Sequence, residues 1–397
     1  MYKKLVYSFG LLLTLIMGIS CIKYEKQGGK IATKSVAANS VDLNLDCSSA
    51  YLIEQKTGKV LYAQNECEKL KPASMTKMMG LLLVCEKIYN NTIKLDDIVA
   101  VSDQAARMGG SQVFLEPNEK ISVHDLLKSV CISSANDSMY ALGEYIATTN
   151  DNFINMMNKK ANDINLENTH FVNVTGFDDD NHYTCAKDMA TIAQNLLKYE
   201  SIILPYTSMY EGYIRENTDN PFWLVNTNKL VRFYEGLDGL KTGYTSGSGF
   251  CLTATAKRND VRLISVIMNA SSSAKRNEMT KSLLDYGFNK IKSKKMYSAN
   301  EKIGTLKVLN SKQNKVDLYT TSDIVVMLDN EIENPKIKQI IKTNKDIKAP
   351  LKKGDIVGKL IVEVENDIYE FDLMICEDIK EYNYINRFFD TLKSILA

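Results

Sequence analysis

Histidine is scarce in this sequence, with only three residues among 397: His124, His170 and His182. They form no His-x-x-x-His pattern, and no cysteine pair has the Cys-x-x-Cys spacing of common zinc sites. The acidic run at 178–180 lacks the alternating ligands of a calcium loop, and it indicates a solvated loop. We therefore expect a protein with no metal site and no cofactor.

A strong excess of charge of either sign is also missing. The chain carries 49 Lys and Arg against 48 Asp and Glu, a formal net charge of +1. Proteins that bind nucleic acid through its phosphates usually present a strong positive field. The lysine clusters at 290–295 and 336–348 are interpreted as solvated surface, and no nucleic-acid partner is expected.

Closely spaced cysteines, which are typical of a small disulfide scaffold, are absent as well. The eight cysteines are scattered, and several fall in apolar patterns where a reduced thiol packs as a small hydrophobe. Cys47 and Cys67 flank a predicted hairpin and are the one pair that invites a test for a disulfide. We nevertheless expect free thiols.

The N-terminal residues have the organisation of an export signal. Lys3 and Lys4 precede an apolar run over 5–19, and small residues follow at its end. Because this run is short for a membrane-spanning helix, we predict a signal peptide over 1–21, followed by a linker over 22–44. Lipidation of Cys21 is an alternative, although Gly18 stands where such signals usually have leucine.

Hydrophobic periodicity predicts an α/β domain over 45–292. Runs at 50–54 and 59–63 indicate two strands, and a helix follows to about residue 89. Helical spacing recurs in four later segments: 124–131, 137–147, 152–164 and 186–199. From 249 the pattern changes to two continuously apolar strands, 249–256 and 261–268, and a helix over 274–288. We predict an antiparallel sheet flanked by helices, made from both ends of the domain, with an all-helical subdomain between them.

The rest of the chain predicts two smaller parts. Short strands separated by turns indicate a small all-β domain over 296–376: 302–308, 315–319, 324–328, 356–364 and 368–375. Residues 378–397 carry an apolar stripe at helical spacing, with Arg387 and Lys393 on the polar face. This amphipathic helix either packs on the protein or lies in a membrane surface.

A hydroxyl and an amine lie one helical turn apart at Ser74 and Lys77, where the apolar run 78–84 begins. A serine beside an amine at a helix N-terminus has the arrangement of an activated nucleophile. However, Ser-x-x-Lys also occurs at 20–23 and at 272–275, so the pattern has little specificity alone.

Two further motifs supply that specificity. Ser134-Ala-Asn136 stands at the start of a predicted helix, and Lys241-Thr-Gly243 directly precedes the apolar strand pair. Similar tripeptides occur at 298–300 and 56–58, but only one combination runs in order within one domain. Ser-x-x-Lys, Ser-x-Asn and Lys-Thr-Gly together are the signature of class A β-lactamases and penicillin-binding proteins.

Over essentially its whole length the chain resembles the low-molecular-mass penicillin-binding proteins, which are serine-type D-Ala-D-Ala carboxypeptidases. The segments that carry the resemblance are 70–77, 132–137, 168–173, 176–178, 349–354 and 356–358. It implies a β-lactamase/transpeptidase-like fold and an exported protein at the outer face of the cytoplasmic membrane or in the cell wall, docked through its terminal helix. It also implies removal of terminal D-alanine from peptidoglycan stem pentapeptides through an acyl-serine, and acylation of that serine by β-lactam antibiotics.

Residue chemistry and this resemblance together predict the site. Ser74 is expected to be the nucleophile, Lys77 its base when neutral, and Ser134 a proton relay to the leaving amine. Burial and the cation of Lys241 are expected to lower the Lys77 pKa. The predicted substrate-binding residues are Asn136, Lys241, Thr242, Gly243, Tyr244 and Arg276.

These substrate-binding residues have different expected roles. Asn136 can hydrogen-bond the substrate amide, and Gly243 leaves room for a peptide along the edge strand. The resemblance assigns the oxyanion to the backbone N–H groups of Ser74 and Tyr244, where many relatives have histidine in place of tyrosine. It also assigns the substrate carboxylate to Arg276, whose alternative is a solvated helix charge.

Two other functions remain open at the level of sequence. A class A β-lactamase needs a glutamate that activates water, and Glu144 and Glu167 are candidates by position only. A non-catalytic penicillin-binding scaffold would have lost part of the site, whereas all three motifs are intact.

Overall fold

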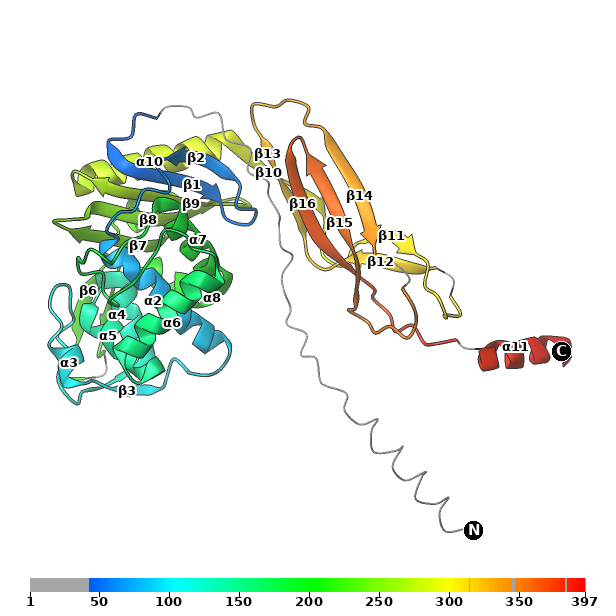
Figure 1. Cartoon of the computed structure of the whole chain (residues 1–397), viewed down its shortest axis with the longest axis horizontal. Helices are drawn as coiled ribbons and strands as arrows, with labels where there is room; N and C mark the ends of the chain where they lie inside the picture. The colour runs from blue at the N-terminus through cyan, green and yellow to red at the C-terminus, as the bar shows by residue number, and fades with distance from the viewer. Residues whose placement is uncertain (1–42, 217, 314, 345–346, 383, 397) are drawn as a thin grey trace, which may run out of the picture.

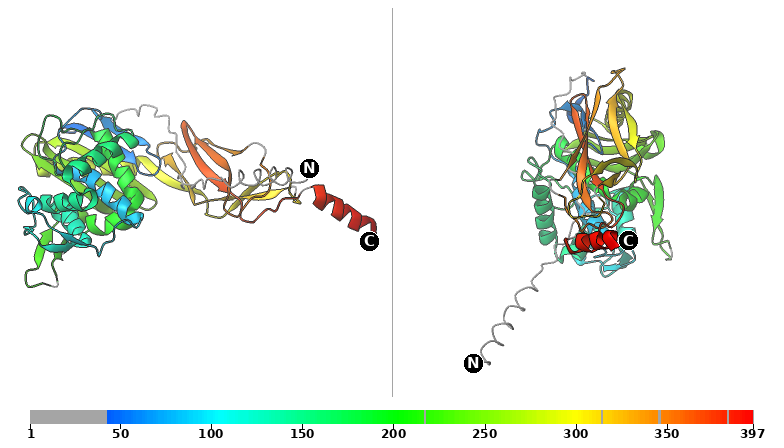
Figure 2. Two further views of the ribbon diagram at one scale, coloured as in Figure 1. Left: turned by 60° about the horizontal axis from the view of Figure 1, so that its bottom comes forward. Right: turned by 90° about the vertical axis from the view of Figure 1, so that its right-hand side faces the viewer.

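The structure, a computed structural model, describes residues 43–216, 218–313, 315–344, 347–382 and 384–396. Figure 1 shows a larger unit of sheet and helices, a smaller unit of strands, and a helix at the C-terminal end. The units lie one after the other along the long axis, with the terminal helix far from the larger unit (Figure 2). The predicted order, an α/β domain and then an all-β domain, is confirmed.

The larger unit is organised on a five-stranded antiparallel sheet in the order β2-β1-β9-β8-β7. Its strands are β1 (Cys47–Glu54), β2 (Val60–Gln64), β7 (Leu237–Thr245), β8 (Gly249–Arg258) and β9 (Val261–Ala270). The sheet therefore joins the two ends of the unit, as predicted. Every residue of the central strand β9 except Asn269 is buried, which explains its continuous apolar run. The strand that carries Lys241, β7, forms one edge.

Helices cover both faces of this sheet. On β1, Tyr51 and Ile53 belong to the core shared with the helical subdomain, whereas Ala50 and Leu52 belong to the core beneath α10 (Ser273–Lys290). This alternation follows from the two-residue period of a strand. The subdomain consists of α2 (Lys77–Tyr89), α3 (Asp103–Ala106), α4 (Val123–Ser133), α5 (Asn136–Ala147), α6 (Asn150–Asp163), α7 (Ala186–Leu196), the 3-10 turn η2 (Leu197–Tyr199) and α8 (Glu200–Thr207). The short α9 (Leu230–Phe233) instead contributes Leu230 to the core beneath α10.

Two short strand pairs were not predicted from the sequence; only the second is a hairpin, because α3 lies between β3 and β4. The strand β3 (Ile98–Ala100) pairs with β4 (Lys120–Ser122), and β5 (Glu211–Ile214) pairs with β6 (Phe222–Val225). Each strand has only three or four residues, which is too short for a clear alternating pattern.

In the smaller unit, β10 (Ile291–Tyr297) pairs with β13 (Ile324–Asp329). A second sheet has the order β11-β12-β16-β15-β14, with β11 (Lys302–Leu306), β12 (Val316–Thr320), β14 (Ile337–Thr343), β15 (Ile356–Val364) and β16 (Asp367–Met374). The lysine cluster at 336–348 was interpreted as solvated surface, and the structure adds that the edge strand β14 lies within it. Its lysines are exposed, as is common on strands that must not pair with other chains.

The larger and smaller units are also joined by an ion pair between Lys59 and Asp367, whose nitrogen and oxygen lie 2.6 Å apart. Cys47 and Cys67 are free thiols, as expected. The predicted signal peptide and most of the predicted linker lie outside the described residues. Within the described part, no helix is long and apolar enough to cross a bilayer.

Candidate active site

Ser74 and Lys77 lie at the junction of a 3-10 turn, η1 (Ala73–Thr76), with helix α2. The Lys77 Nζ is 2.8 Å from the Ser74 Oγ and donates to the Thr175 carbonyl oxygen at 2.9 Å. The predicted hydroxyl–amine pair is therefore in hydrogen-bond contact. Lys77 is fully buried, at 0% exposure, so its amine has left bulk water.

The electrostatic surroundings of Lys77 favour its neutral form. Burial holds the pKa of this amine well below its usual value, and the nearby Lys241 cation lowers it further, while Asp137 acts in the opposite direction. A neutral amine has a free lone pair, which a base needs. The arrangement can therefore accept the Ser74 proton.

Lys241 comes from the middle of β7 and is also buried. Its Nζ donates to the carbonyl oxygen of Thr242 at 3.1 Å. Burial lowers the pKa of Lys241 to about 7, with Cys131 of α4 opposing this shift and Arg276 of α10 adding to it. The sheet, the helical subdomain and α10 thus converge on one charged region.

Ser134 and Asn136 lie between α4 and α5. Ser134 is the C-terminal cap of α4 and has a left-handed backbone with φ of 65°, whereas Asn136 is the first residue of α5. The motif thus joins two helices. The Asn136 Nδ2 donates to the Gly109 carbonyl oxygen at 2.7 Å, but its buried Oδ1 has no partner among the described residues. An unsatisfied buried acceptor costs free energy, which a donor from a ligand would recover.

The segment Thr242 to Tyr244 lies on the edge strand β7. The Thr242 hydroxyl donates to the Thr227 hydroxyl at 2.7 Å. A Cβ on Gly243 would lie 2.7 Å from the Pro72 carbonyl oxygen, so the absent side chain lets the strand pack on the turn that holds Ser74. This differs from the expected reason, room for a peptide. Tyr244 is 57% exposed and stacks on Phe250, with ring centroids 4.3 Å apart.

Arg276 is 5% exposed, although its sequence position equally suited a solvated helix charge. Its guanidinium donates to the Asn277 Oδ1 at 2.8 and 3.1 Å, and no carboxylate pairs with it among the described residues. Burial lowers its pKa to about 10, a value at which the group is still charged at neutral pH. A buried cation without a counter-ion is suited to an anionic ligand.

The loop at 173–177 contributes to the site without having been predicted to do so. Asn173 Oδ1 accepts from the N–H groups of Gly176, at 2.7 Å, and Phe177, at 3.2 Å. This fold of the loop presents the Thr175 carbonyl to Lys77. Gly176 has φ of 92°, and a Cβ there would collide with the carbonyl oxygen of Ala73. A backbone carbonyl cannot be recognised in a sequence, but Gly176 is a sequence signal for the tight loop that presents it.

His182 ties the end of this loop to the nucleophile turn. Its Nδ1 accepts from the Val172 N–H at 3.0 Å, which leaves the Nε2 as the donor to the Thr76 hydroxyl at 2.7 Å. Burial lowers the His182 pKa to about 4, so the ring is neutral at physiological pH. This histidine therefore has a positioning function in the turn.

Comparison with known proteins agrees with this geometry. A family model described as "D-alanyl-D-alanine carboxypeptidase" matches residues 33–272, more than half of the chain. The chain belongs to this family. A second model, "Penicillin-binding protein 5, C-terminal domain", matches residues 292–381. Family and fold predictions are confirmed, and so is the predicted enzyme class, a serine carboxypeptidase.

Individual relatives of this carboxypeptidase match over most of this chain or over the larger unit. D-alanyl-D-alanine carboxypeptidase DacF of Bacillus subtilis is 41% identical over 94% of this chain and 96% of its own. The crystal structure of penicillin binding protein 5 from Haemophilus influenzae is 30% identical, covers 85% of this chain and 98% of its own, and has a TM-score of 0.71. Penicillin-binding protein D2 from Listeria monocytogenes in its ampicillin-bound form is 30% identical, covers 62% and 100%, and has a TM-score of 0.56.

The glutamates that a β-lactamase would require are placed differently. Glu144 Oε2 accepts from the Ser102 hydroxyl at 2.7 Å, and Glu167 is exposed. Neither forms a hydrogen bond or an ion pair with Ser74 or Lys77 in the described part of the chain. The positions of Glu144 and Glu167 therefore give no support to a class A β-lactamase mechanism.

Proposed function

We propose that this carboxypeptidase releases the terminal D-alanine from peptidoglycan stem pentapeptides through an acyl-Ser74 intermediate. The observation that carries the proposal is the buried Lys77 amine, 2.8 Å from the Ser74 Oγ, in a member of the D-alanyl-D-alanine carboxypeptidase family. The ampicillin complex of a relative supports β-lactams as acylating inhibitors. The predicted N-terminal signal supports action outside the cytoplasm, at the membrane or in the cell wall.

The reaction proceeds in two transfers. Lys77 takes the Ser74 proton as Oγ attacks the carbonyl carbon between the last two residues, and the backbone N–H groups of Ser74 and Tyr244 hold the oxyanion. Collapse of this intermediate breaks the C–N bond, and the leaving amine receives a proton relayed through Ser134. Water then attacks the acyl-serine with Lys77 as base, which releases the shortened peptide and restores Ser74.

Substrate recognition follows from the edge position of β7. An extended peptide pairs with this strand beside Gly243, while the unpartnered Asn136 Oδ1 accepts from a substrate amide. Lys241 adds positive charge beside the nucleophile. The Thr242 hydroxyl and the Arg276 guanidinium receive the C-terminal carboxylate, which distinguishes a free chain end from an internal peptide bond.

Replacement of Arg276 by glutamine is expected to lower kcat/KM for a peptide ending in D-Ala-D-Ala by roughly 10- to 100-fold. The reason is that a hydrogen bond to a charged group contributes about 1.5–3 kcal/mol, and 1.4 kcal/mol corresponds to tenfold. D-alanine release is measured beside hydrolysis of the same peptide with an amidated C-terminus. The amidated peptide should lose little, and Lys275→Gln on the exposed side of the same helix is the control. Equal losses on both peptides would exclude a carboxylate-binding role.

The C-terminal helix α11 (Tyr384–Leu396) supplies the proposed attachment to the membrane. Its exposed apolar side chains include Ile385 at 63%, Leu392 at 42% and Ile395 at 74%. In sequence, the segment also carries the basic residues Arg387 and Lys393, a composition that favours anionic lipid headgroups. The helix lies at the end of the molecule far from the catalytic unit (Figure 2), so the site can face the wall.

Deletion of residues 383–397 is expected to abolish binding to vesicles of phosphatidylglycerol and phosphatidylcholine, while D-alanine release from a soluble peptide stays unchanged. The cut preserves the bridges Leu351 with Ile379 and Ser311 with Glu381, which hold the preceding segment on the β unit. Vesicle co-sedimentation provides the measurement, and Ile385→Ser with Leu392→Ser is a milder variant of the same test. Undiminished sedimentation of the truncated protein would show that another surface binds the membrane.

A further inference from the structure

The loop at 107–119 makes direct contacts with the second motif of the site. The Gly109 carbonyl oxygen accepts from the Asn136 side chain at 2.7 Å, and the Ser111 carbonyl oxygen accepts from its backbone N–H at 2.6 Å. The loop therefore fixes the direction in which the Asn136 Oδ1 points. Backbone hydrogen bonds hold both ends of the loop, for example between Val101 and Glu119. Its middle part, 109–115, has neither helical nor strand structure and depends on contacts with other elements.

One anchor of this loop comes from helix α5. The carboxylate of Asp137, adjacent to Asn136, accepts from the N–H groups of Val113 at 2.9 Å and Leu115 at 3.2 Å. Asp137 is completely buried, and the N–H of Ser138 donates to its other oxygen at 2.8 Å. Two N–H groups of the loop backbone are therefore held by Asp137, the residue that follows Asn136.

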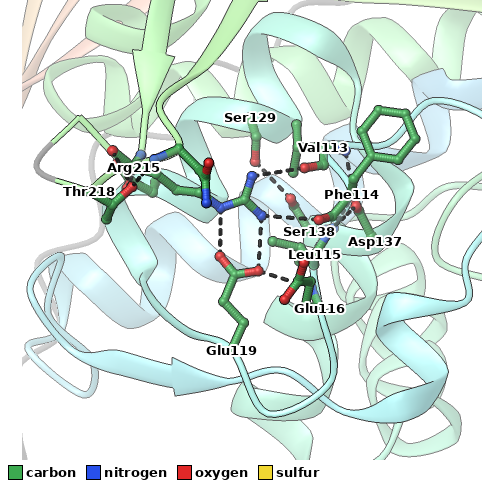
Figure 3. A network of polar contacts seen from close by, with 12 residues as sticks. Val113, Phe114, Leu115, Glu116, Glu119, Ser129, Asp137, Ser138, Arg215 and Thr218 are labelled. Carbon is green, nitrogen blue, oxygen red and sulfur yellow. Dashed lines mark hydrogen bonds and ion pairs between the residues drawn. The ribbon is translucent and has the colours of Figure 1, made fainter.

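The second anchor comes from the β5–β6 hairpin, far along the chain. The guanidinium of Arg215, just after β5, donates to the carbonyl oxygens of Val113 at 3.0 Å and Phe114 at 3.2 Å. Its Nε and Nη2 also donate to Glu119 at 2.6 and 2.9 Å. Figure 3 shows the guanidinium between the Glu119 carboxylate and the loop carbonyls, with Asp137 on the other side of the loop.

The two anchors bind the same short stretch of backbone, one through its N–H groups and the other through its carbonyl oxygens. Asp137 takes the N–H groups on either side of Phe114, while Arg215 takes the carbonyls at Val113 and Phe114. A guanidinium can reach a carboxylate and two carbonyls together because its donors form a rigid planar fork. The 15% exposure of the Arg215 side chain strengthens these bonds, since water competes little for them.

We propose that Arg215 is a positioning residue for the carboxypeptidase reaction: through the 107–119 loop it fixes the Asn136 side chain that receives the substrate. The inference rests on the proposed role of Asn136 in binding the substrate amide. It gives the β5–β6 hairpin, which contributes none of the predicted site residues, a specific part in catalysis. Arg215 itself contacts no substrate.

The test compares Arg215→Lys and Arg215→Gln with the wild type in the rate of acylation by a fluorescent penicillin, expressed per titrated active site. We expect a loss on the order of 10- to 100-fold for both, because a displacement of about 1 Å in a positioned group can cost 100-fold. Lysine should not rescue the rate, since a single ammonium can reach Glu119 but cannot also hold both carbonyls. A merely structural role would instead lower the number of titratable sites and leave the rate per site unchanged.

Glu216→Gln provides the matched control. Glu216 belongs to the same hairpin and pairs with Lys128 at 2.9 Å, but among the described residues it forms no hydrogen bond or ion pair with the loop. This variant removes one ion pair of the hairpin and should acylate at the wild-type rate. Thermal unfolding of all variants verifies that they are folded.

Asn136→Ala, alone and combined with Arg215→Lys, separates this inference from the proposed role of Asn136. If Arg215 acts through Asn136, the double variant should be little slower than Asn136→Ala alone. If Asn136→Ala is acylated slowly but Arg215→Lys at the wild-type rate, only the role of Arg215 is overturned. The same holds if the losses of acylation rate in the double variant are fully additive. If Asn136→Ala is acylated at the wild-type rate, the substrate role of Asn136 is overturned, and this inference with it.

Discussion

Replacement of Ser74 by alanine is expected to abolish both D-alanine release from a D-Ala-D-Ala peptide and labelling by fluorescent penicillin. The hydroxyl is the only group placed to form the acyl bond beside the Lys77 amine in the described site, so no partial reaction should remain. Mass spectrometry of the penicillin-treated protein gives the direct measurement. The wild type should gain the mass of one penicillin on the peptide containing Ser74, and the variant should gain none.

The sequence supplies a control for this experiment. Ser272 stands in another Ser-x-x-Lys pattern, but its hydroxyl caps α10 by accepting from the Lys275 N–H at 3.1 Å. Ser272→Ala should therefore lose about 1 kcal/mol of stability, typical of an N-cap, and keep full labelling. Labelling of purified Ser74→Ala, or D-alanine release by it, would refute the assignment of the nucleophile.

Replacement of Lys77 by methionine is expected to slow acylation by roughly 10²- to 10⁴-fold, the contribution typical of a positioned general base. Ser74 would remain in place without a group to accept its proton. The rate of penicillin acylation, followed against pH, is the measurement. In the wild type the rate should rise through a pKa well below the usual lysine value, and this rising limb should vanish in the variant.

Stability should change in the opposite direction to activity. Because the fold lowers the Lys77 pKa, the unfolded state binds a proton that the folded state lacks between the two pKa values. Folding stability therefore rises with pH across that window, and the buried amine is destabilising below it. Lys77→Met removes this cost and should unfold at a temperature no lower than the wild type at neutral pH. Lys275→Met, which changes an exposed lysine, should leave the acylation rate unchanged. A wild-type rate in Lys77→Met would exclude the amine as base.

Those parts of the fold that have strong periodicity were predictable from the sequence. The continuously apolar segments became β8 and β9, and the hairpin at 50–64 became β1 and β2. The strand β14 was not recognised, because an edge strand buries little and its lysines resemble an ordinary solvated surface. The hairpin of β5 and β6 was too short to give a period.

In the site, the reactive side chains could be predicted but the groups that hold them could not. Ser74 and Lys77 carry a pattern that follows from helix geometry, whereas the carbonyl of Thr175 could belong to any residue. Arg215 reaches the site through a loop and a hairpin, so its contacts depend on tertiary structure alone. The role of Arg276 could not be decided from the sequence either, because only its burial distinguishes a ligand-binding cation from a charge on the surface.

The order of strands in the central sheet has a consequence for when the enzyme can act during its synthesis. Ser74 and Lys77 are made early, but the strand that carries Lys241 attaches through β8 to β9, and β9 must also pair with β1. Such long-range pairing cannot begin before the late strands exist. A growing chain that ends before Ala270 therefore holds a nucleophile without a finished binding surface. We therefore expect the binding surface to be complete only when the strands up to Ala270 are available to fold.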